Sequence, residues 1–446
     1  MGKKFRALRN YNVFYTNPIE LSVGEKIKIN FKKINPPKWE GWFFCQSSSG
    51  NCGWISENYF KVENPNICSS AATITKEYTA RELGIKQGEK CTALFHDHGW
   101  TFCEDQNGLQ GWLPDEVLRP EYDEKKLGRY IAHYSELEDA TNVNRDADFG
   151  RKFEFERLGI HHLTLNPGEI SSDPHAESLE EEFVYVVEGT PDFWVDGLLY
   201  RSKPGDCIAF PAGTGICHAV VNNSKEDARI LSIGERSKSD NKCYFVDKNL
   251  QKKCPIAWMD WPGQEFGFLN STEIFQRPKL NENYRPKFLR NFSELLVERE
   301  YTYTGEEKLK YYGADLGRKL DLKVLGIGHD IIRKNTFSSW QHAHSVEEEL
   351  VFILKGHPTL LFNDRQFELS PGMVAAFPSG TGHAHCLINR ANDDVHFLVL
   401  GEQIPIDDKV IYPLHSRRNE ICREKGIYWE EAPQQPTNQD FLEWLK

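Results

Sequence analysis

The chain has 446 residues, of which 39% are apolar and 27% charged, as in ordinary globular proteins. Its formal charge is −12, and no basic stripe interrupts this acidic balance, so neither nucleic acid nor an anionic membrane surface is an expected partner. No apolar run has the length of a signal peptide or a transmembrane helix. The eleven cysteines include no C-x-x-C pair. We therefore expect reduced cysteines and a cytoplasmic protein without a membrane partner.

Short strand-like segments occupy the first part of the chain, up to Pro120. Trp42 and Trp54 each follow a glycine and precede apolar residues, and Trp100 and Trp112 repeat this arrangement. The segments around them resemble the SH3 family, which implies two successive small β-barrels. The expected SH3-like domains cover residues 1–64 and 69–120.

The SH3 resemblance also implies a possible peptide site. SH3 domains bind proline-rich peptides in an aromatic groove, because such peptides are already extended and lose little entropy. The residues that would line such grooves here are Tyr11, Trp42, Tyr59, Trp100 and Pro114. The alternative is that these side chains pack within the barrels or against the rest of the chain. A proline-rich peptide partner is thus one of two open interpretations.

After a polar, partly helical connector, the chain repeats itself without a gap. The numbers of His175 and His342 differ by a fixed offset (342 − 175 = 167), which we call the repeat offset. The same offset relates the pairs Glu182 and Glu349, Gly205 and Gly372, Pro211 and Pro378, His218 and His385, and Asn222 and Asn389. So many matching positions at one offset indicate an internal duplication.

The second copy carries a candidate metal site. His342 and His344 are separated by one residue, so on an extended segment both imidazoles leave the same face. Glu349 follows just before an apolar run, and a Gly and Pro turn leads to His385. Three imidazoles and one carboxylate suit Mn, Fe(II), Ni or Zn and leave two coordination positions for a substrate or water.

These spacings resemble the two motifs of the cupin superfamily, although Thr336 replaces a usual glycine. The resemblance implies two jelly-roll barrels in tandem and an all-β protein. As in a homodimer, the two barrels are expected to pack face to face about a pseudo-two-fold axis. The expected divisions are a connector at 121–148, the first cupin at 149–254, a strap at 255–315, the second cupin at 316–416, and a C-terminal strap with a short helix at 417–446.

The first copy has a different ligand set, because Glu177 stands where the second copy has His344. Its candidate ligands are His175, Glu177, Glu182 and His218. These residues either form a second site with harder ligands or line a vestigial polar pocket. We expect the second copy to bind metal more tightly.

Further polar residues lie beside these motifs. His383 precedes His385 with one residue between them, and it is either a catalytic acid or base, a partner of a ligand, or a residue of the cavity rim. Four neighbouring glutamates are expected to be solvent-facing loop charges, namely Glu180, Glu181, Glu347 and Glu348. His162 and His329 are expected to be structural.

Two classes of function remain open. The first is a metalloenzyme that acts on a small oxygen-bearing molecule, of the dioxygenase, decarboxylase or isomerase type found among bicupins. The second is a ligand-binding or scaffold protein without catalysis, recruited to partners by its SH3-like domains.

Overall fold

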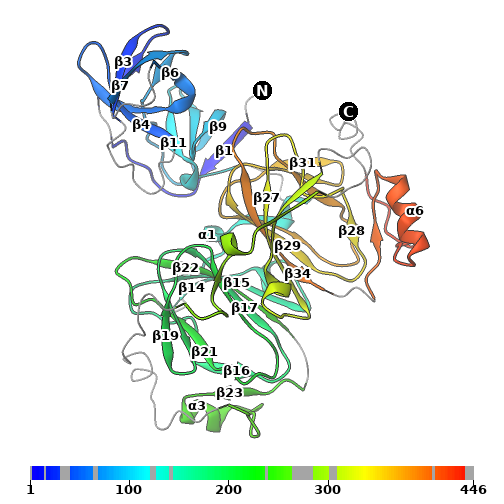
Figure 1. Ribbon diagram of the computed structural model, residues 1–446. Helices are drawn as coiled ribbons and strands as arrows, with labels where there is room; N and C mark the ends of the chain where they lie inside the picture. The colour runs from blue at the N-terminus through cyan, green and yellow to red at the C-terminus, as the bar shows by residue number, and fades with distance from the viewer. Residues whose placement is uncertain are drawn as a thin grey trace. The chain divides into compact units, whose positions relative to one another are not determined.

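The computed structural model describes residues 3–14, 17–30, 41–63, 69–120, 127–139, 144–236, 240–263, 285–300, 309–403 and 407–436. Strands dominate these residues, and the expected all-β class is confirmed. The chain divides into two compact units, residues 1–123 and residues 124–446 apart from 369–371. Figure 1 colours the first unit blue to cyan and the second cyan through green and yellow to red. The expected C-terminal helix at 438–446 lies outside the described residues. No described helix has the length and apolar character needed to cross a membrane.

The first unit contains two five-stranded antiparallel sheets, in the strand orders β5-β4-β3-β7-β6 and β11-β10-β9-β1-β12. The strands of the first sheet are β3 (Lys26–Asn30), β4 (Trp42–Gln46), β5 (Cys52–Ser56), β6 (Phe60–Val62) and β7 (Ser69–Ile74). Those of the second are β1 (Lys3–Ala7), β9 (Lys90–Asp97), β10 (Trp100–Asp105), β11 (Gln110–Pro114) and β12 (Leu118–Pro120). A further pair joins β2 (Glu20–Leu21) to β8 (Tyr78–Thr79), and the 3₁₀ turns are η1 (Glu57–Tyr59) and η2 (Asp115–Val117).

The two small barrels exchange their first strands. Strand β1 opens the chain but pairs with β9 and β12 of the second barrel. Strand β7 opens the second repeat but pairs with β3 and β6 of the first. The expected boundaries at 64 and 69 placed each strand in its own barrel, and this assignment is corrected. An opening strand has the same local pattern in either sheet, so the sequence does not reveal the exchange.

The second unit contains two larger barrels, which we call the first and second barrels. The sheets of the first have the orders β14-β15-β22-β17-β20-β24 and β19-β18-β21-β16-β23. Their bounds are β14 (Arg145–Asp148), β15 (Leu158–Leu165), β16 (His175–Glu177), β17 (Glu182–Glu188), β18 (Asp192–Val195), β19 (Leu198–Arg201), β20 (Asp206–Phe210), β21 (His218–Val221), β22 (Ala228–Glu235), β23 (Cys243–Phe245) and β24 (Arg290–Asn291).

The second barrel has the sheets β13-β32-β29-β34-β27-β26-β25, β31-β30-β33 and β28-β35. Their bounds are β13 (Ile131–His133), β25 (Val297–Glu300), β26 (Lys310–Asp315), β27 (Leu325–Ile332), β28 (Ala343–His344), β29 (Glu349–Lys355), β30 (Thr359–Phe362), β31 (Arg365–Glu368), β32 (Met373–Phe377), β33 (His385–Ile388), β34 (Val395–Glu402) and β35 (Val410–Ile411). The described helical segments of this unit are η3 (Leu127–Tyr130), α1 (Tyr134–Leu137), α2 (Phe149–Lys152), α3 (Lys248–Lys253), η4 (Phe292–Glu294), α5 (Leu316–Lys319) and α6 (Ser416–Glu424).

These barrels also exchange a strand. The segment before the first barrel supplies β13, which pairs with β32 of the second barrel. The segment before the second barrel supplies β24, which pairs with β20 of the first. Part of the connector and part of the strap therefore belong to the sheet of the opposite barrel.

The two barrels share one hydrophobic core. Its largest cluster combines Phe183, Tyr185 and Leu231 of the first barrel with Leu350 and Phe352 of the second, among others. Side chains alternate along a strand, so the neighbours of these residues point into each barrel instead. This shared cluster fits the expectation that the barrels pack face to face.

Two buried glutamates complete the contact between the barrels in a symmetric way. The carboxylate of Glu181 accepts three backbone N–H groups of residues 323–325, at 2.7 to 3.0 Å. Glu348, its counterpart in the second copy, accepts those of residues 156–158, at 2.8 to 3.1 Å. The side chains are 3% and 2% exposed. The expectation that Glu181 and Glu348 face solvent was therefore wrong, and the reciprocal contacts confirm the pseudo-two-fold arrangement.

Replacing Glu181 by alanine is expected to destabilise the second unit. The change leaves three buried N–H groups without an acceptor, and each such group costs about 1–3 kcal/mol. We expect the free energy of unfolding to fall by roughly 3 kcal/mol or more in urea titrations. Glu180→Ala, at a half-buried neighbour, is the matched control. Equal stability of the two variants would show that the buried carboxylate does not hold the barrels together.

Candidate metal centres

Three candidate ligands of the second barrel meet where its strands begin. His342 immediately precedes β28, while Glu349 and His385 are the first residues of β29 and β33. His342 and His385 form an isolated β-bridge, with N to O distances of 3.2 and 2.9 Å in the two directions. Their backbones therefore hold the two imidazoles side by side, with ring centroids 4.9 Å apart.

The ring orientations direct the remaining donor atoms toward one another. Nδ1 of His342 lies 2.8 Å from the carbonyl of Trp340, so its Nε2 is left for the centre. Nε2 of His385 is buried without a hydrogen bond to any described residue and lies 3.4 Å from Glu349 Oε2. Three possible ligand atoms, one each from His342, Glu349 and His385, lie within 4.8 Å of one another. An unsatisfied buried nitrogen in such a cluster fits a metal ligand.

Metal binding requires deprotonated ligands. Two of these groups have pKa values low enough to be deprotonated at neutral pH. Burial, with the nearby imidazoles of His385 and His344, lowers the pKa of His342 to about 3. Burial alone would raise the pKa of Glu349, but His385, His342 and His344 lower it to about 2. At neutral pH, His342 is therefore neutral and Glu349 ionised.

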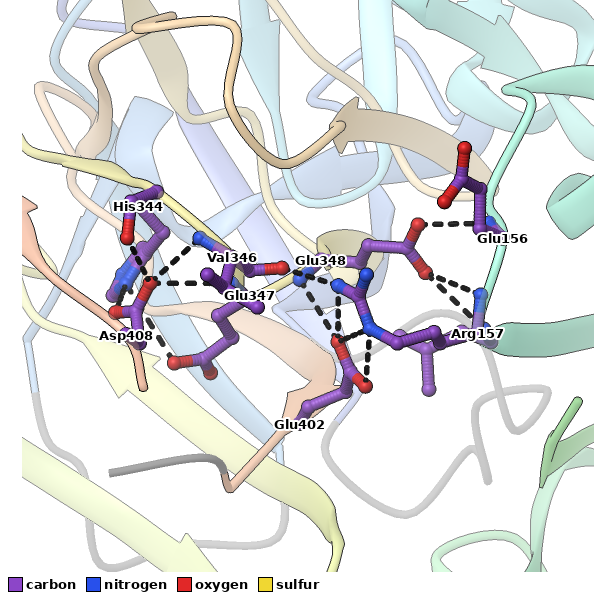
Figure 2. A network of polar contacts seen from close by, with 10 residues as sticks. Glu156, Arg157, His344, Val346, Glu347, Glu348, Glu402 and Asp408 are labelled. Atoms are coloured by element: carbon purple, nitrogen blue, oxygen red, sulfur yellow. Dashed lines mark hydrogen bonds and ion pairs between the residues drawn. The ribbon is translucent and has the colours of Figure 1, made fainter. Parts of the chain in front are cut away.

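His344 completes the set in a different way. Its Nε2 lies 3.9 Å from Glu349 Oε2, whereas its Nδ1 lies 2.6 Å from Asp408 Oδ2. Burial lowers the pKa of His344, but Asp408, Glu347 and Glu349 together raise it to about 9. Figure 2 shows His344 and Asp408 facing each other at one end of a network of polar contacts. Through Nε2, His344 can serve as the fourth ligand.

A cavity of about 350 Å³ opens beside these ligands. The four candidate ligands and Glu347 lie in its wall, together with Asp330 from β27, Tyr412 and Arg418 from α6. The apolar lining includes Val351, Leu360, Phe377, Leu387, Phe397 and Val399. Glu347 therefore faces the cavity and not solvent, which corrects that expectation; burial and the carboxylates of Glu349 and Asp408 raise its pKa to about 8.

The first barrel holds an equivalent three-residue cluster, and its fourth candidate ligand, like His344 in the second barrel, lies outside that cluster. Glu182 Oε2 lies 2.7 Å from His218 Nε2 and 3.6 Å from His175 Nε2. Burial would raise the pKa of Glu182, but His218 and His175 hold it well below its usual value. Burial lowers the pKa of His175, but Glu182 raises it to about 9. Glu177 lies outside this three-residue cluster and accepts a hydrogen bond from Asn241.

The interiors of the two barrels differ. Six positions that line the cavity of the second barrel have apolar counterparts in the first copy, at the repeat offset, that pack into one hydrophobic cluster. These counterparts are Leu163, Val184, Phe193, Phe210, Val220 and Ile230. Leu163 replaces Asp330, and Phe193 replaces the smaller Leu360. At two other positions the first copy has the smaller side chain, Val220 opposite Leu387 and Ile230 opposite Phe397, so the clearest difference between the two interiors is the carboxyl group of Asp330.

His383 lies away from the cavity. Its Nδ1 is 3.1 Å from the amide nitrogen of Asn363, and its ring packs against Tyr130 and Phe362. Burial, with the charge of Arg129, lowers the pKa of His383 to about 4. Strict alternation holds only in a strand, and β33 begins at His385, so the expected shared side is corrected. The structure gives no support to a catalytic role for His383.

The comparison with protein families agrees with this architecture. The Cupin domain family matches residues 161–234 and 328–401, which are the centres of the two larger barrels. Both larger barrels are cupin domains. The Variant SH3 domain family matches residues 4–63. The chain is thus a bicupin with SH3-like domains at its N-terminus. The histidine and glutamate clusters of the cupins suit a divalent transition metal.

Two solved structures illustrate the distant similarity of this chain to known proteins. A variant of Bacillus subtilis oxalate decarboxylase has 16% identity and a TM-score of 0.39, over 63% of this chain and 78% of that chain. A variant of salicylate 1,2-dioxygenase from Pseudoaminobacter salicylatoxidans in complex with gentisate has 13% identity and a TM-score of 0.43, over 64% and 86%. No curated protein matches the sequence significantly.

The aromatic residues of the SH3-like domains pack against each other. Trp42 is 4% exposed and contacts Trp100 and Trp112 of the second small barrel, with ring centroids 6.2 and 5.6 Å apart. Tyr59 is 8% exposed and packs on Tyr78. Trp42 also lines a pocket together with Trp100, Trp112 and Tyr78, so a peptide groove at these rings stays a prediction.

The remaining groove residues lie beside this contact. Tyr11 packs on Trp100, whose strand pairs Trp100 with Pro114. All three are partly exposed. A proline-rich peptide partner stays a prediction.

Sequence reasoning missed five residues around the cupin sites, namely Asp330, Asp408, Asn241, Tyr412 and Arg418. Asp330 had a visible signal, because it places a carboxyl group where the first copy has Leu163 in an apolar run. Asp408 and Asn241 are also related by the repeat offset (408 − 241 = 167). Comparing the copies at this offset beyond the motifs would have identified them.

Proposed function

We propose that this bicupin is a metal-dependent enzyme whose reaction takes place in the second cupin. The observation that carries the proposal is the cavity of about 350 Å³ with four candidate ligands in its wall. Small-molecule sites commonly have volumes of about 300–1,000 Å³. The first cupin, whose corresponding positions form a buried apolar cluster, then serves mainly as the structural partner of the second.

The ligands for the metal are His342, His344, Glu349 and His385. Three nitrogens and one oxygen would hold the metal, and in six-fold coordination they would leave two positions for a chelating molecule. When bound, Mn, Fe(II), Ni or Zn supplies Lewis acidity toward an oxygen of that molecule and, in the case of iron, redox chemistry.

The other residues of the cavity indicate which molecules fit. Apolar side chains cover much of the wall and exclude water from a bound ligand. Asp330 offers hydrogen-bond acceptors to a hydroxyl or amine, and Arg418 offers donors to an anionic group. We infer a small, partly apolar substrate with two oxygens that can chelate the metal, such as a hydroxy acid or a diol.

Metal analysis followed by a substrate screen tests this function. Purified protein is stripped with a chelator, reconstituted separately with Mn, Fe(II), Ni and Zn, and assayed with small acids, sugars and diols. We expect turnover that depends on one of these metals and disappears on its removal. Stoichiometric metal binding without turnover of any compound, together with ligand binding, would favour the non-catalytic alternative.

A further inference from the structure

Two facing positions beside the metal ligands differ together between the cupins: the fourth candidate ligand and the residue that hydrogen-bonds to it. In the second cupin, Nδ1 of His344 donates to Oδ2 of Asp408 at 2.6 Å. At the corresponding positions of the first cupin, Nδ2 of Asn241 donates to Oε2 of Glu177. Asn241 precedes β23 and Asp408 precedes β35, and each has the complementary hydrogen-bonding group for the ligand position that it faces.

The anchoring of Asp408 and Asn241 is otherwise the same. Oδ1 of Asp408 accepts the backbone N–H of Val346 at 2.9 Å and the hydroxyl of Ser345 at 3.3 Å. Oδ1 of Asn241 makes the equivalent contacts at 3.0 and 3.3 Å, with Leu179 and Ser178. In both cupins, Oδ1 thus binds the loop that carries the ligands. Only the second terminal atom of the side chain differs, Oδ2 in Asp408 and Nδ2 in Asn241.

The fixed oxygen explains why the two residues must change together. Because Oδ1 is engaged by the loop, the amide of Asn241 can present only its N–H group, which suits a carboxylate and not an imidazole N–H. The carboxylate of Asp408 can only accept, which suits the Nδ1–H of His344 but would repel Glu177. A single exchange in either cupin produces two like groups facing each other.

We propose that Asp408 and Asn241 are positioning residues that set the identity of the fourth ligand in each cupin. Asp408 holds the His344 ring so that Nε2 is left for the metal, whereas Asn241 holds the Glu177 carboxylate. The second cupin is thereby a site of three imidazoles and one carboxylate, and the first a site of two imidazoles with harder oxygen ligands. This inference rests on the metal binding proposed above, and the two can fail separately.

The network around Asp408 also fixes the loop itself. Figure 2 shows contacts that run from Asp408 to Val346 and Glu347. They continue to Arg157 of the first cupin, which binds Glu402 of the second. The N–H of Glu347 donates to Asp408 Oδ1 at 3.2 Å, and the carbonyl of Val346 accepts from Arg157. Asp408 thus acts within a rigid setting, in which loss of its acceptor affects His344 directly.

The first experiment measures metal binding in the second cupin, with His175→Ala present to weaken the first site. Asp408→Asn is expected to lower the affinity for Co(II) by roughly 10- to 100-fold, as loss of a partner behind a ligand does. Adding His344→Glu, which copies the pair of the first cupin, should restore binding and shift the Co(II) absorption spectrum because one nitrogen ligand is replaced. Unchanged Co(II) affinity in Asp408→Asn, or no recovery in the double variant, would overturn the proposal.

The second experiment needs no metal. Asn241→Asp should lower the melting temperature of metal-free protein by roughly 2–4 °C, because it places a second carboxylate against Glu177. Adding Glu177→His should restore the melting temperature. This experiment tests the pairing of Asn241 with Glu177 even if the protein binds no metal. If Asn241→Asp does not lower the melting temperature and Glu177→His does not raise it again, the proposal is overturned even for a protein that binds metal.

Discussion

His342→Ala is expected to remove most of the metal bound by the second cupin. The imidazole of His342 is neutral and buried, its Nδ1 is engaged by the carbonyl of Trp340, and its Nε2 belongs to the ligand cluster. Loss of a direct ligand should lower affinity by more than the roughly 10- to 100-fold that loss of an outer partner costs. Elemental analysis of the purified variant measures the result, and turnover should fall with the metal content.

His175→Ala is the matched control for this prediction. It removes the equivalent imidazole from the three-residue cluster of the first cupin. We expect this variant to keep the metal of the second cupin and its activity. If His175→Ala empties the protein of metal while His342→Ala leaves it full, the ranking of the two sites is wrong.

Asp330→Leu is expected to impair substrate binding while metal content stays near normal. The change copies Leu163 of the first cupin and replaces a polar group of the cavity wall by an apolar one. A hydrogen bond to a charged group contributes about 1.5–3 kcal/mol, so kcat/KM should fall roughly 10- to 100-fold. Steady-state kinetics with the substrate found in the screen measure the effect.

Asp330→Asn separates recognition from shape in the same assay. Asparagine keeps the volume and one acceptor, so its kcat/KM should lie between those of the native protein and Asp330→Leu. If Asp330→Leu has the same kcat/KM as the native protein, the substrate does not reach β27 and Asp330 has another role.

The structure also explains why residues with similar sequence contexts have different roles. Glu347 and Glu348 are adjacent in a run of three glutamates, yet one lines the cavity and the other accepts three N–H groups from the opposite barrel. A charge next to an apolar strand is usually solvated, so the sequence favoured exposure for both. Only the position of the opposite barrel shows that Glu348 faces buried backbone donors.

The duplication, the two cupin motifs and the ligand types followed from the sequence alone. The repeat offset stays constant because both copies keep the same strand lengths and turns, and ligand spacing is a local property of a strand and a turn. For the same reason His342, Glu349 and His385 could be named together, as could His175, Glu182 and His218.

Tertiary structure alone decided the contacts between segments distant in the chain. The exchange of β1 with β7, and of β13 with β24, leaves the local pattern of each strand unchanged. The direction of His383 depends on where β33 begins, and the cavity of the second barrel is lined by side chains from separate strands. Asp408 reaches His344 from a distant part of the chain, because β35, which follows it, pairs with β28. Such pairings depend on packing in three dimensions, for which periodicity and spacing carry no signal.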